Sequence, residues 1–392
     1  MTLPAPDPTD PAGLDALLTE DEKAVRTAVR QMLDVSAEPY IAEWFEKGEI
    51  PNIRELTKEL GSLGVLGMHL EGYGCAGMSA TEYGLACLEL EATDSGLRSL
   101  VSVQGSLAMF AIWRWGSEEQ KQEWLPQMAA GDAIGCFGLT EPDVGSDPAN
   151  LQTRARRDGS DWVLNGRKMW ISNAPYADVA VVWAATDEGI RGFVVPADTP
   201  GFSAPEIKHK MSLRASATGE LVLDDVRLPA SAMLPEARGL KGPLACLNEA
   251  RFGIVWGSLG AARSSLEVAR RYSQERIQFG KPIGAFQLTQ QKLADMSLEY
   301  TKGYLLAVHL GRRKDAGLLR PEQVSIGKLN NVREAIEICR TARTILGANG
   351  ISLEYPVIRH QNNLESVLTY EGTVEMHTLV LGQLLTGHAA FR

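Results

Sequence analysis

The residues of this chain that are best suited to metal or redox chemistry are scattered. The five cysteines form no CxxC pair and the six histidines lack metal-ligand spacing, so we expect reduced, mostly buried thiols and no metal site. One run, Gly72-Tyr-Gly-Cys-Ala-Gly77, matches the GxGxxG pattern of dinucleotide-binding loops, and Asp94 lies near the expected acidic position. That pattern requires a preceding strand. The flanking residues have helical patterns instead, so we interpret the run as a connection between two helices.

The composition is that of a folded protein with more than one domain. Of the 392 residues, 44% are hydrophobic and 22% are charged, and the length predicts two or three domains. A net charge of -10 argues against nucleic-acid binding, because phosphate backbones attract basic surfaces. The longest apolar stretches, 107–113 and 179–185, have seven residues, so we expect no membrane insertion. The N-terminus has no basic residue before Lys23 and no apolar signal segment, which predicts a cytoplasmic protein.

Helices are predicted from about residue 19 to 130, because capping boxes precede three runs of apolar residues at helical spacing. Each box pairs a serine or threonine with an acidic or amide residue three positions later, as follows: Thr19 with Glu22, Ser79 with Glu82, and Ser117 with Gln120.

Strands are predicted between residues 131 and 240. Asp158-Gly159 and Asn165-Gly166 are typical turn dipeptides, and runs rich in valine follow them. Helical periodicity returns after residue 243, with long stretches at 252–275 and 287–316 that favour a bundle. We therefore predict an α+β multidomain fold with an N-terminal α-helical domain (1–130), a central antiparallel, β-barrel-like domain (131–240) and a C-terminal four-helix bundle (241–392).

Five segments together resemble the acyl-CoA dehydrogenase family: CFGLTEPDVGSD (136–147), KMWISNAP (168–175), ERIQFGKPIGAFQ (275–287), TILGANG (344–350) and TYEGT (369–373). They occur in the family's order and spacing, and the resemblance extends from about residue 20 to the end of the chain. Further segments are most similar to the members that oxidise glutaryl-CoA: DSGLRSLVSVQ (94–104), KMSLRASATGE (210–220), ACLNEARFG (245–253) and the run that ends in TYEGT.

The resemblance implies that Glu371 is the catalytic base that removes the α-proton of an acyl thioester. No side chain accepts a hydride, so oxidation needs a cofactor, and the family implies FAD, with the β-hydride passing to flavin N5. A carboxylate suits the base if the closed site excludes water and raises its pKa. Gly372 suits close approach of the backbone to a ligand, and an amide near Glu371 is expected to hydrogen-bond the thioester oxygen. Without the motif, a single glutamate is more often a solvated surface charge.

The resemblance also implies which residues hold FAD. Trp170 offers a flat face and Ser172 a hydroxyl, although a strand-core tryptophan and a turn serine are the simpler alternatives. Arg276 and Gln287 are expected to reach the ADP part of the flavin from a neighbouring subunit, which predicts a homotetramer. The implied cofactor-binding set is Phe137, Gly138, Leu139, Thr140, Ser146, Trp170, Ile171, Ser172, Arg276, Gln287, Arg343, Leu346, Gly347 and Thr373.

Arg98 carries the expectation about substrate class. In the resembling members an arginine at this point holds the distal carboxylate of the acyl group, and a guanidinium pairs with a carboxylate in a bidentate manner. Ser102 shares its helix face if that helix begins after Gly96. A surface arginine paired with Glu91 is the alternative. The resemblance implies a substrate-binding set of Arg98, Ser99, Ser102, Glu91, Tyr370, Ser146, Arg251 and Gly372; Arg251 is equally suited to be a buried structural partner of a carboxylate.

The resemblance thus implies FAD-dependent oxidation of glutaryl-CoA, release of CO2 to give crotonyl-CoA, and transfer of electrons to an electron-transfer flavoprotein. Three alternatives stay open: a dehydrogenase of another short or polar acyl-CoA, an oxidase or monooxygenase that reacts with O2, and a non-catalytic acyl-CoA-binding protein. Glu371 argues against the last of these.

Overall fold

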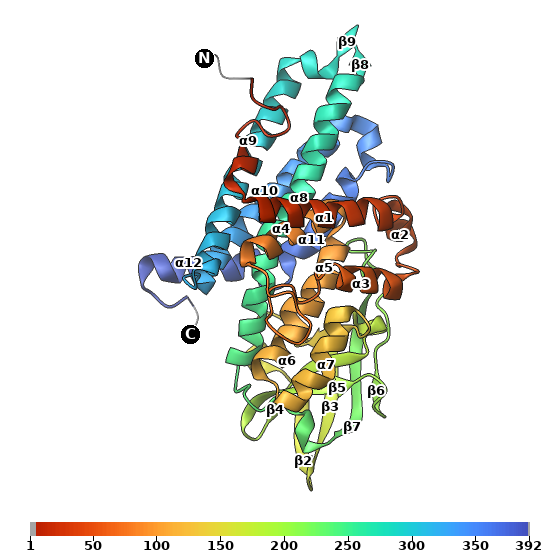
Figure 1. Cartoon of the computed structure of the whole chain (residues 1–392), viewed down its shortest axis with the longest axis vertical. Coiled ribbons are helices and arrows are strands. Elements are labelled where there is room, and N and C mark those ends of the chain that lie inside the picture. The colour runs from red at the N-terminus through yellow and green to blue at the C-terminus, as the bar shows by residue number, and fades with distance from the viewer. Residues whose placement is uncertain (1–4, 391–392) are drawn as a thin grey trace.

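The N-terminal part of the computed structural model, which describes residues 5–390, is helical (Figure 1). All three predicted capping boxes are present: Thr19, Ser79 and Ser117 each accept a hydrogen bond from the third residue of their helix, whose side chain bonds back. The helices are α1 (Glu20–Ser36), α2 (Ile41–Lys47), α3 (Ile53–Ser62), α4 (Ala80–Thr93), α5 (Ser95–Ser102), α6 (Phe110–Trp115) and α7 (Glu118–Ala130). Residues 72–77 form the loop before α4, as predicted, and no strand precedes them within residues 5–71.

A seven-stranded sheet fills the middle of the chain, in the order β1-β4-β2-β3-β7-β6, with β5 beside β4. It is mostly antiparallel, whereas we predicted an antiparallel domain; β4 runs parallel to β1 and β2. The strands are β1 (Gly135–Gly138), β2 (Arg154–Asp158), β3 (Asp161–Ser172), β4 (Val179–Thr186), β5 (Gly189–Pro196), β6 (Phe202–Ser203) and β7 (Thr218–Leu228).

One of the two predicted turns in the sheet is wrong. Asp158 and Asp161 do close a hairpin between β2 and β3. Asn165-Gly166 instead lies inside β3, where the pairing with β7 shifts register between Leu164 and Gly166. Gly166 has φ 151°, and the side chain of Asn165 exchanges two hydrogen bonds of 2.9 Å with Asp225 on β7. A cross-strand partner therefore turns this dipeptide into a bulge.

The C-terminal part is a bundle in which α10 packs on α8, α9, α11 and α12. The helices are α8 (Lys241–Glu275), α9 (Gln287–Asp315), α10 (Pro321–Leu346), α11 (Val357–Thr369) and α12 (Val374–Thr386). Two short strands, β8 (Ile277–Gln278) and β9 (Lys281–Pro282), join α8 to α9 at the end of the bundle farthest from the sheet (Figure 1). No helix within residues 5–390 combines the length and the hydropathy needed to span a bilayer.

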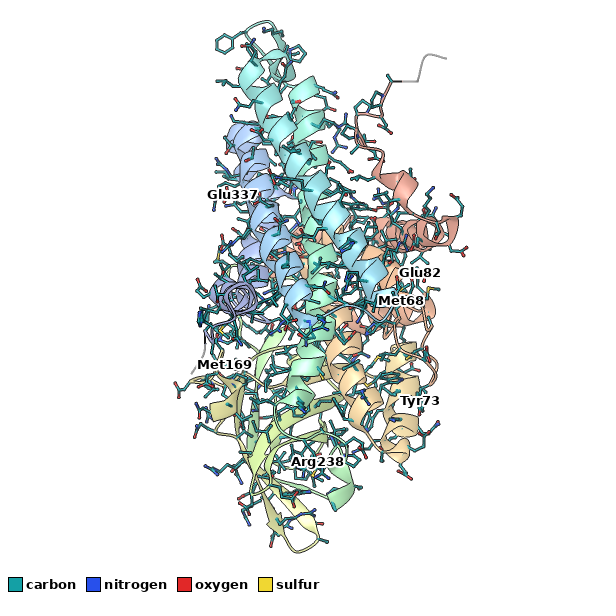
Figure 2. All side chains as sticks on the ribbon, turned by 90° about the vertical axis from the view of Figure 1, so that its left-hand side faces the viewer. Met68, Tyr73, Glu82, Met169, Arg238 and Glu337 are labelled. Atoms are coloured by element: carbon teal, nitrogen blue, oxygen red, sulfur yellow. The ribbon has the colours of Figure 1, made fainter. Side chains whose placement is uncertain are left out.

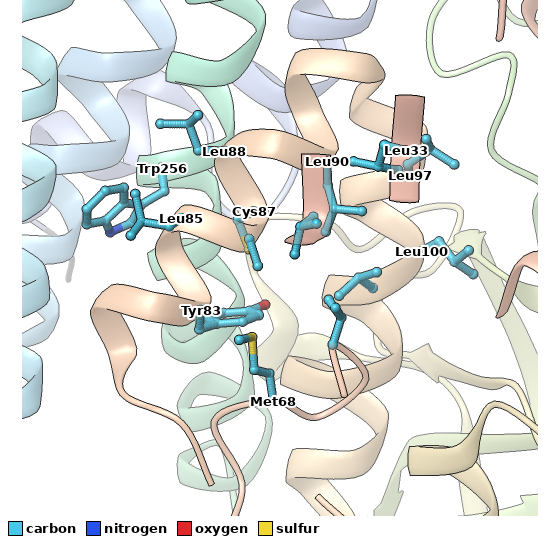
Figure 3. Close-up of a cluster of buried hydrophobic side chains, with 14 of the residues drawn as sticks. Leu33, Met68, Tyr83, Leu85, Cys87, Leu88, Leu90, Leu97, Leu100 and Trp256 are labelled. Carbon is cyan, nitrogen blue, oxygen red and sulfur yellow. The ribbon is translucent and has the colours of Figure 1, made fainter. Parts of the chain in front are cut away.

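Helix α4 is the centre of the largest apolar core and joins the N-terminal helices to the bundle. Leu33 of α1, Tyr83, Cys87 and Leu88 of α4, and Trp256 of α8 are buried together (Figure 3). All five cysteines are free, and only Cys75 is partly exposed, as the sequence predicted. This packing fixes α4 and α8 against each other, and the same two helices carry Glu91 and Arg251 toward the turn that bears Glu371.

Candidate active site

Glu371 lies in the short turn between α11 and α12. The backbone there is in the left-handed region, with φ 55° at Glu371 and φ 100° at Gly372. Glycine adopts this conformation freely, but a glutamate does so only when its surroundings hold it. Thr373 begins α12 as its N-cap, where its hydroxyl accepts a bond from the backbone N–H of Met376. The turn therefore fixes the backbone that carries the glutamate.

One oxygen of the half-buried Glu371 carboxyl, Oε2, is inaccessible and has no partner among the described residues. Burial raises the pKa of Glu371, while the nearby charges of Arg98, Lys328 and Arg251 act in the opposite direction. A carboxyl with an inaccessible, unpaired oxygen close to cations is typical of a functional group rather than of a structural ion pair.

Two cations, the buried Lys328 and the half-buried Arg251, donate hydrogen bonds to the backbone of this turn. The Nζ of Lys328 donates to the carbonyl oxygens of Tyr370 and Gly372, at 2.5 and 2.6 Å, and the Nε of Arg251 donates to the carbonyl of Glu371 at 2.7 Å. Arg251 thus contacts the main chain at Glu371 rather than a carboxylate. Lys328 was not among the predicted site residues; the available signal was a charge at position 328 on the apolar face of α10, in register with Val324 and Val332.

Arg98 is buried, which excludes the surface alternative. Only 1% of its side chain is exposed, and its Nε donates to Oε2 of Glu91 at 2.7 Å. Its guanidinium also donates to the hydroxyl of Tyr370 and lies 5.6 Å from the centre of that ring. Gly257 of α8 makes room for this group, because a Cβ there would stand 2.1 Å from Glu91 Oε2. Arg98, Glu91, Tyr370 and Glu371 are thereby brought together from α4, α5 and the turn.

Ser99 and Ser102 are also buried, at 2% and 0% exposure. Helix α5 begins at Ser95, one residue before Gly96 rather than after it, with Asp94 as its N-cap. The hydroxyl of Ser102 has no partner within residues 5–390. An unsatisfied buried hydroxyl is costly unless a ligand or a water molecule bonds to it.

Some of the residues that are expected to contact the flavin ring lie close together at the end of β3. Trp170 has φ 62° at a register shift in this strand and is 56% exposed, which excludes a strand-core role. Met169 donates its backbone N–H to the carbonyl of Thr140 at 2.8 Å and so joins 137–140 to 170–172. Met169 lies where the sheet approaches the bundle (Figure 2). An exposed indole beside two joined backbone segments fits the flat ring system of a flavin.

A buried lysine that the sequence analysis missed reinforces this join. Lys168 Nζ donates to the carbonyl of Leu139 at 3.1 Å and to Glu141 at 2.8 Å. Glu141 also accepts the backbone N–H groups of Gln152 and Thr153. By contrast, Ser146 is exposed in the loop that follows, so its predicted contact with CoA or FAD stays a prediction.

The remaining cofactor candidates form a second group elsewhere. Arg276 and Gln287 are exposed beside the β8–β9 hairpin, and residues 343–347 end α10. A bond of 3.0 Å from Asn349 to Tyr272 joins these two regions. Figure 1 shows the β8–β9 hairpin at the end of the molecule opposite to the central sheet. One chain therefore does not bring Arg276 or Gln287 to Trp170. Within residues 5–390 no cluster of three or more histidine, cysteine or acidic groups suits a metal ion.

Three family models cover most of the chain. They are described as the acyl-CoA dehydrogenase N-terminal domain (residues 19–132), middle domain (136–226) and C-terminal domain (237–385). The human mitochondrial short-chain specific acyl-CoA dehydrogenase is 38% identical over 340 residues, which cover 85% of this chain and 82% of that protein.

Solved structures agree with the family models. A glutaryl-CoA dehydrogenase from Mycobacterium smegmatis is 70% identical, with a TM-score of 0.97 over 98% of this chain and 99% of that chain. Another structure of a glutaryl-CoA dehydrogenase from this organism, in complex with FADH2, is 67% identical, with a TM-score of 0.95 over 96% and 97% of the two chains.

Proposed function

The chain belongs to the acyl-CoA dehydrogenase family and its cofactor is FAD, and from this premise we propose that it oxidises and decarboxylates glutaryl-CoA. The observation that carries the proposal is the buried Arg98. Around Glu371 three cations, Arg98, Arg251 and Lys328, face two carboxylates, Glu91 and Glu371. A substrate that brings one more carboxylate balances this charge, whereas an alkyl chain does not. The 70% identity with a glutaryl-CoA dehydrogenase supports the same choice.

In the proposed reaction Glu371 removes the proton from Cα of the thioester. An amide near Glu371 donates to the thioester oxygen as enolate charge develops. When bound, FAD supplies an acceptor for the hydride that leaves Cβ. Residues 137–140 and 170–172 would hold its ring system, and Thr373 lies at the end of the catalytic turn.

Arg98 is proposed to orient the distal carboxylate, with Ser99, Ser102, Glu91 and Tyr370 around it. After oxidation the bond between this carboxylate and the γ-carbon breaks, and CO2 leaves. The electron pair stays on the conjugated thioester. The protonated Glu371 is the nearest donor that can then protonate the terminal carbon and give crotonyl-CoA.

A second candidate is the oxidation of a short acyl-CoA without a distal carboxylate. The 38% identity with a short-chain specific dehydrogenase favours it. In that case the guanidinium of Arg98 keeps Glu91 and Tyr370 as partners, but the excess positive charge around Glu371 stays unbalanced when the substrate is bound. The buried charge therefore makes it the weaker candidate.

We also propose that the protein is a homotetramer in the cytoplasm and that it passes electrons to an electron-transfer flavoprotein. We place its domain boundaries near residues 130 and 240. The separation of Arg276 and Gln287 from Trp170 supports an assembly in which a neighbouring subunit completes the FAD site. Sedimentation of the yellow protein tests this. A monomer that retains one FAD per chain would contradict it.

The decisive experiment mixes the enzyme anaerobically with glutaryl-CoA or butyryl-CoA and follows bleaching of the flavin absorbance. We expect faster bleaching with glutaryl-CoA. In turnover with an artificial acceptor, glutaryl-CoA labelled at its distal carboxyl is expected to release one CO2 per crotonyl-CoA. Preferential bleaching by butyryl-CoA would favour the second candidate. Accumulation of glutaconyl-CoA would retain the oxidation and reject the decarboxylation.

A further inference from the structure

Three successive carbonyl groups at the turn that carries Glu371 each accept a hydrogen bond from a cationic side chain. Lys328 donates to the carbonyls of Tyr370 and Gly372, the two neighbours of Glu371. Arg251 donates to the carbonyl of Glu371 itself. Lys328 is only 2% exposed. A single Nζ atom between carbonyls on both sides of the proposed base leaves that turn little freedom.

The turn needs such support for two reasons. Glu371 has φ 55°, which costs free energy for a residue with a side chain. The carbonyl of Tyr370 also lies at the C-terminus of α11, where unpaired carbonyl groups and the helix dipole favour a cation. Lys328 satisfies both requirements from α10.

We propose that Lys328 is a positioning residue for the base, which holds the strained turn and keeps a positive charge behind Glu371. This inference rests on the proposed role of Glu371. Lys328 acts through the backbone and through its charge, because its Nζ donates to two backbone carbonyl oxygens on either side of Glu371.

Charges from every neighbouring element bear on Glu371. Cations come from α5 (Arg98), α8 (Arg251) and α10 (Lys328), and an opposing carboxylate comes from α4 (Glu91). On α12, His377 packs against Gly372. Burial lowers the pKa of His377 to about 3, so His377 is neutral at physiological pH. Tyr370 is neutral there too, because burial raises its pKa.

The surroundings of Lys328 also shift its own pKa. Burial lowers the pKa of Lys328, and the charge of Glu371 acts to raise it. The ammonium and the carboxylate therefore support each other's ionised forms, although no ion pair joins them within the described residues. Loss of the ammonium is expected to make Glu371 harder to ionise.

Two substitutions separate the charge of Lys328 from its geometry. Lys328→Met removes the charge and both hydrogen bonds at similar length. Lys328→Arg keeps the charge, but a planar guanidinium cannot place one nitrogen between the two carbonyls in the same way. Lys302→Met is the matched control, because Lys302 is 55% exposed on α9 and pairs with Glu299.

The experiment measures kcat/KM against pH for the FAD-loaded enzymes with glutaryl-CoA, and the isotope effect with substrate deuterated at Cα. For Lys328→Met we expect the acid limb of kcat/KM to move to higher pH by about one unit and kcat to fall by about 10- to 100-fold. For Lys328→Arg we expect an unmoved acid limb, a kcat at least about 10-fold lower with KM changed less than about 3-fold, and a larger isotope effect. Lys302→Met is expected to match the wild type.

An acid limb in Lys328→Met that coincides with the wild type would overturn the proposal, as would unchanged kcat and isotope effect in Lys328→Arg. If Lys328→Met does not fold, the result for Lys328→Arg decides alone. Glu371→Gln in the same assay separates the two hypotheses. Normal turnover of that variant rejects the base and this inference together, whereas an inactive Glu371→Gln beside normal Lys328 variants rejects this inference only.

Discussion

Two glutamates in the helical part of the chain, the buried Glu89 and the half-buried Glu371, have opposite surroundings. Glu89, on α4, accepts four hydrogen bonds of 2.7 to 3.1 Å from Arg30 and Arg263, on α1 and α8. Glu371, between α11 and α12, has an Oε2 atom with no partner among residues 5–390. Desolvation raises the pKa of each carboxyl, but only around Glu89 do the arginines more than offset it and lower the pKa.

The difference distinguishes a carboxylate that stabilises the fold from one that is available for chemistry. The fork of an arginine satisfies a carboxylate and locks its geometry. Around Glu371 the cations are turned toward other acceptors: Arg98 toward Glu91, and Lys328 and Arg251 toward backbone carbonyls. They stabilise the negative charge from a distance and leave its oxygens free to accept a proton.

The largest expected effect is on catalysis at Glu371. Glu371→Gln keeps nearly the same shape but cannot accept the α-proton, so we expect a loss of several orders of magnitude in kcat while FAD and acyl-CoA still bind. Stopped-flow bleaching of the flavin with glutaryl-CoA measures the rate. Wild-type turnover in this variant would remove Glu371 from the role of base and end the contrast with Glu89.

Removal of Arg98 is expected to act on one substrate class only. Arg98→Ala should lower kcat/KM for glutaryl-CoA by roughly 30-fold to several thousand-fold, equivalent to about 2 to 5 kcal/mol for a desolvated charge pair. Butyryl-CoA lacks the distal carboxylate and should be oxidised as well as before, or better. The measurement is kcat/KM for both thioesters in both enzymes. Equal losses with the two substrates would make Arg98 a structural residue, as Arg263 is beside Glu89.

Loss of the carboxylate at position 89 is expected to act on stability rather than on catalysis. Glu89→Gln leaves the guanidinium groups of Arg30 and Arg263 without the carboxylate that they share. We therefore expect the free energy of unfolding to fall by about 2 to 4 kcal/mol, with kcat nearly unchanged. Urea unfolding at a fixed protein concentration measures the change. The control is Glu337→Gln (Figure 2), whose partner Arg340 is on the surface and whose effect should stay within about 0.5 kcal/mol. A loss of kcat without a loss of stability would place Glu89 in the catalytic machinery.

Local signals predicted the elements well, and long-range contacts explain the errors. The capping boxes at Thr19, Ser79 and Ser117 formed because each depends on residues three positions apart. Asn165-Gly166 has an equally local turn signal, but pairing with Asp225, 60 residues away, overrides it.

The same contrast between local signals and long-range contacts applies to the candidate site. The motifs located Glu371, and a four-residue spacing related Arg98 to Ser102. The partners of these residues come from distant parts of the chain: Tyr370 is 272 positions from Arg98, and Lys328 reaches Tyr370 from another helix. Which buried cation faces a carboxylate and which faces a carbonyl is decided by helix packing, so the sequence named Arg251 without its acceptor and omitted Lys328.

The smallest expected effect is on the pH dependence of stability. The folded-state pKa of Glu89 is lowered, so its stabilising contribution is present above the unfolded-state pKa of about 4.3 and is lost as the pH falls through the folded value. The folded-state pKa of Glu371 is raised, so its carboxyl costs stability once the pH rises above the unfolded value.

Glu371→Gln should therefore melt about 1 to 3 °C above the wild type at pH 7 and at the same temperature below pH 4. Glu89→Gln should melt below the wild type at pH 7, and this gap should also narrow in acid. Thermal scans from pH 3 to 8 measure both gaps. If Glu371→Gln melted below the wild type at neutral pH, its carboxylate would be satisfied in the folded protein, and the two glutamates would not differ in the way that the structure indicates.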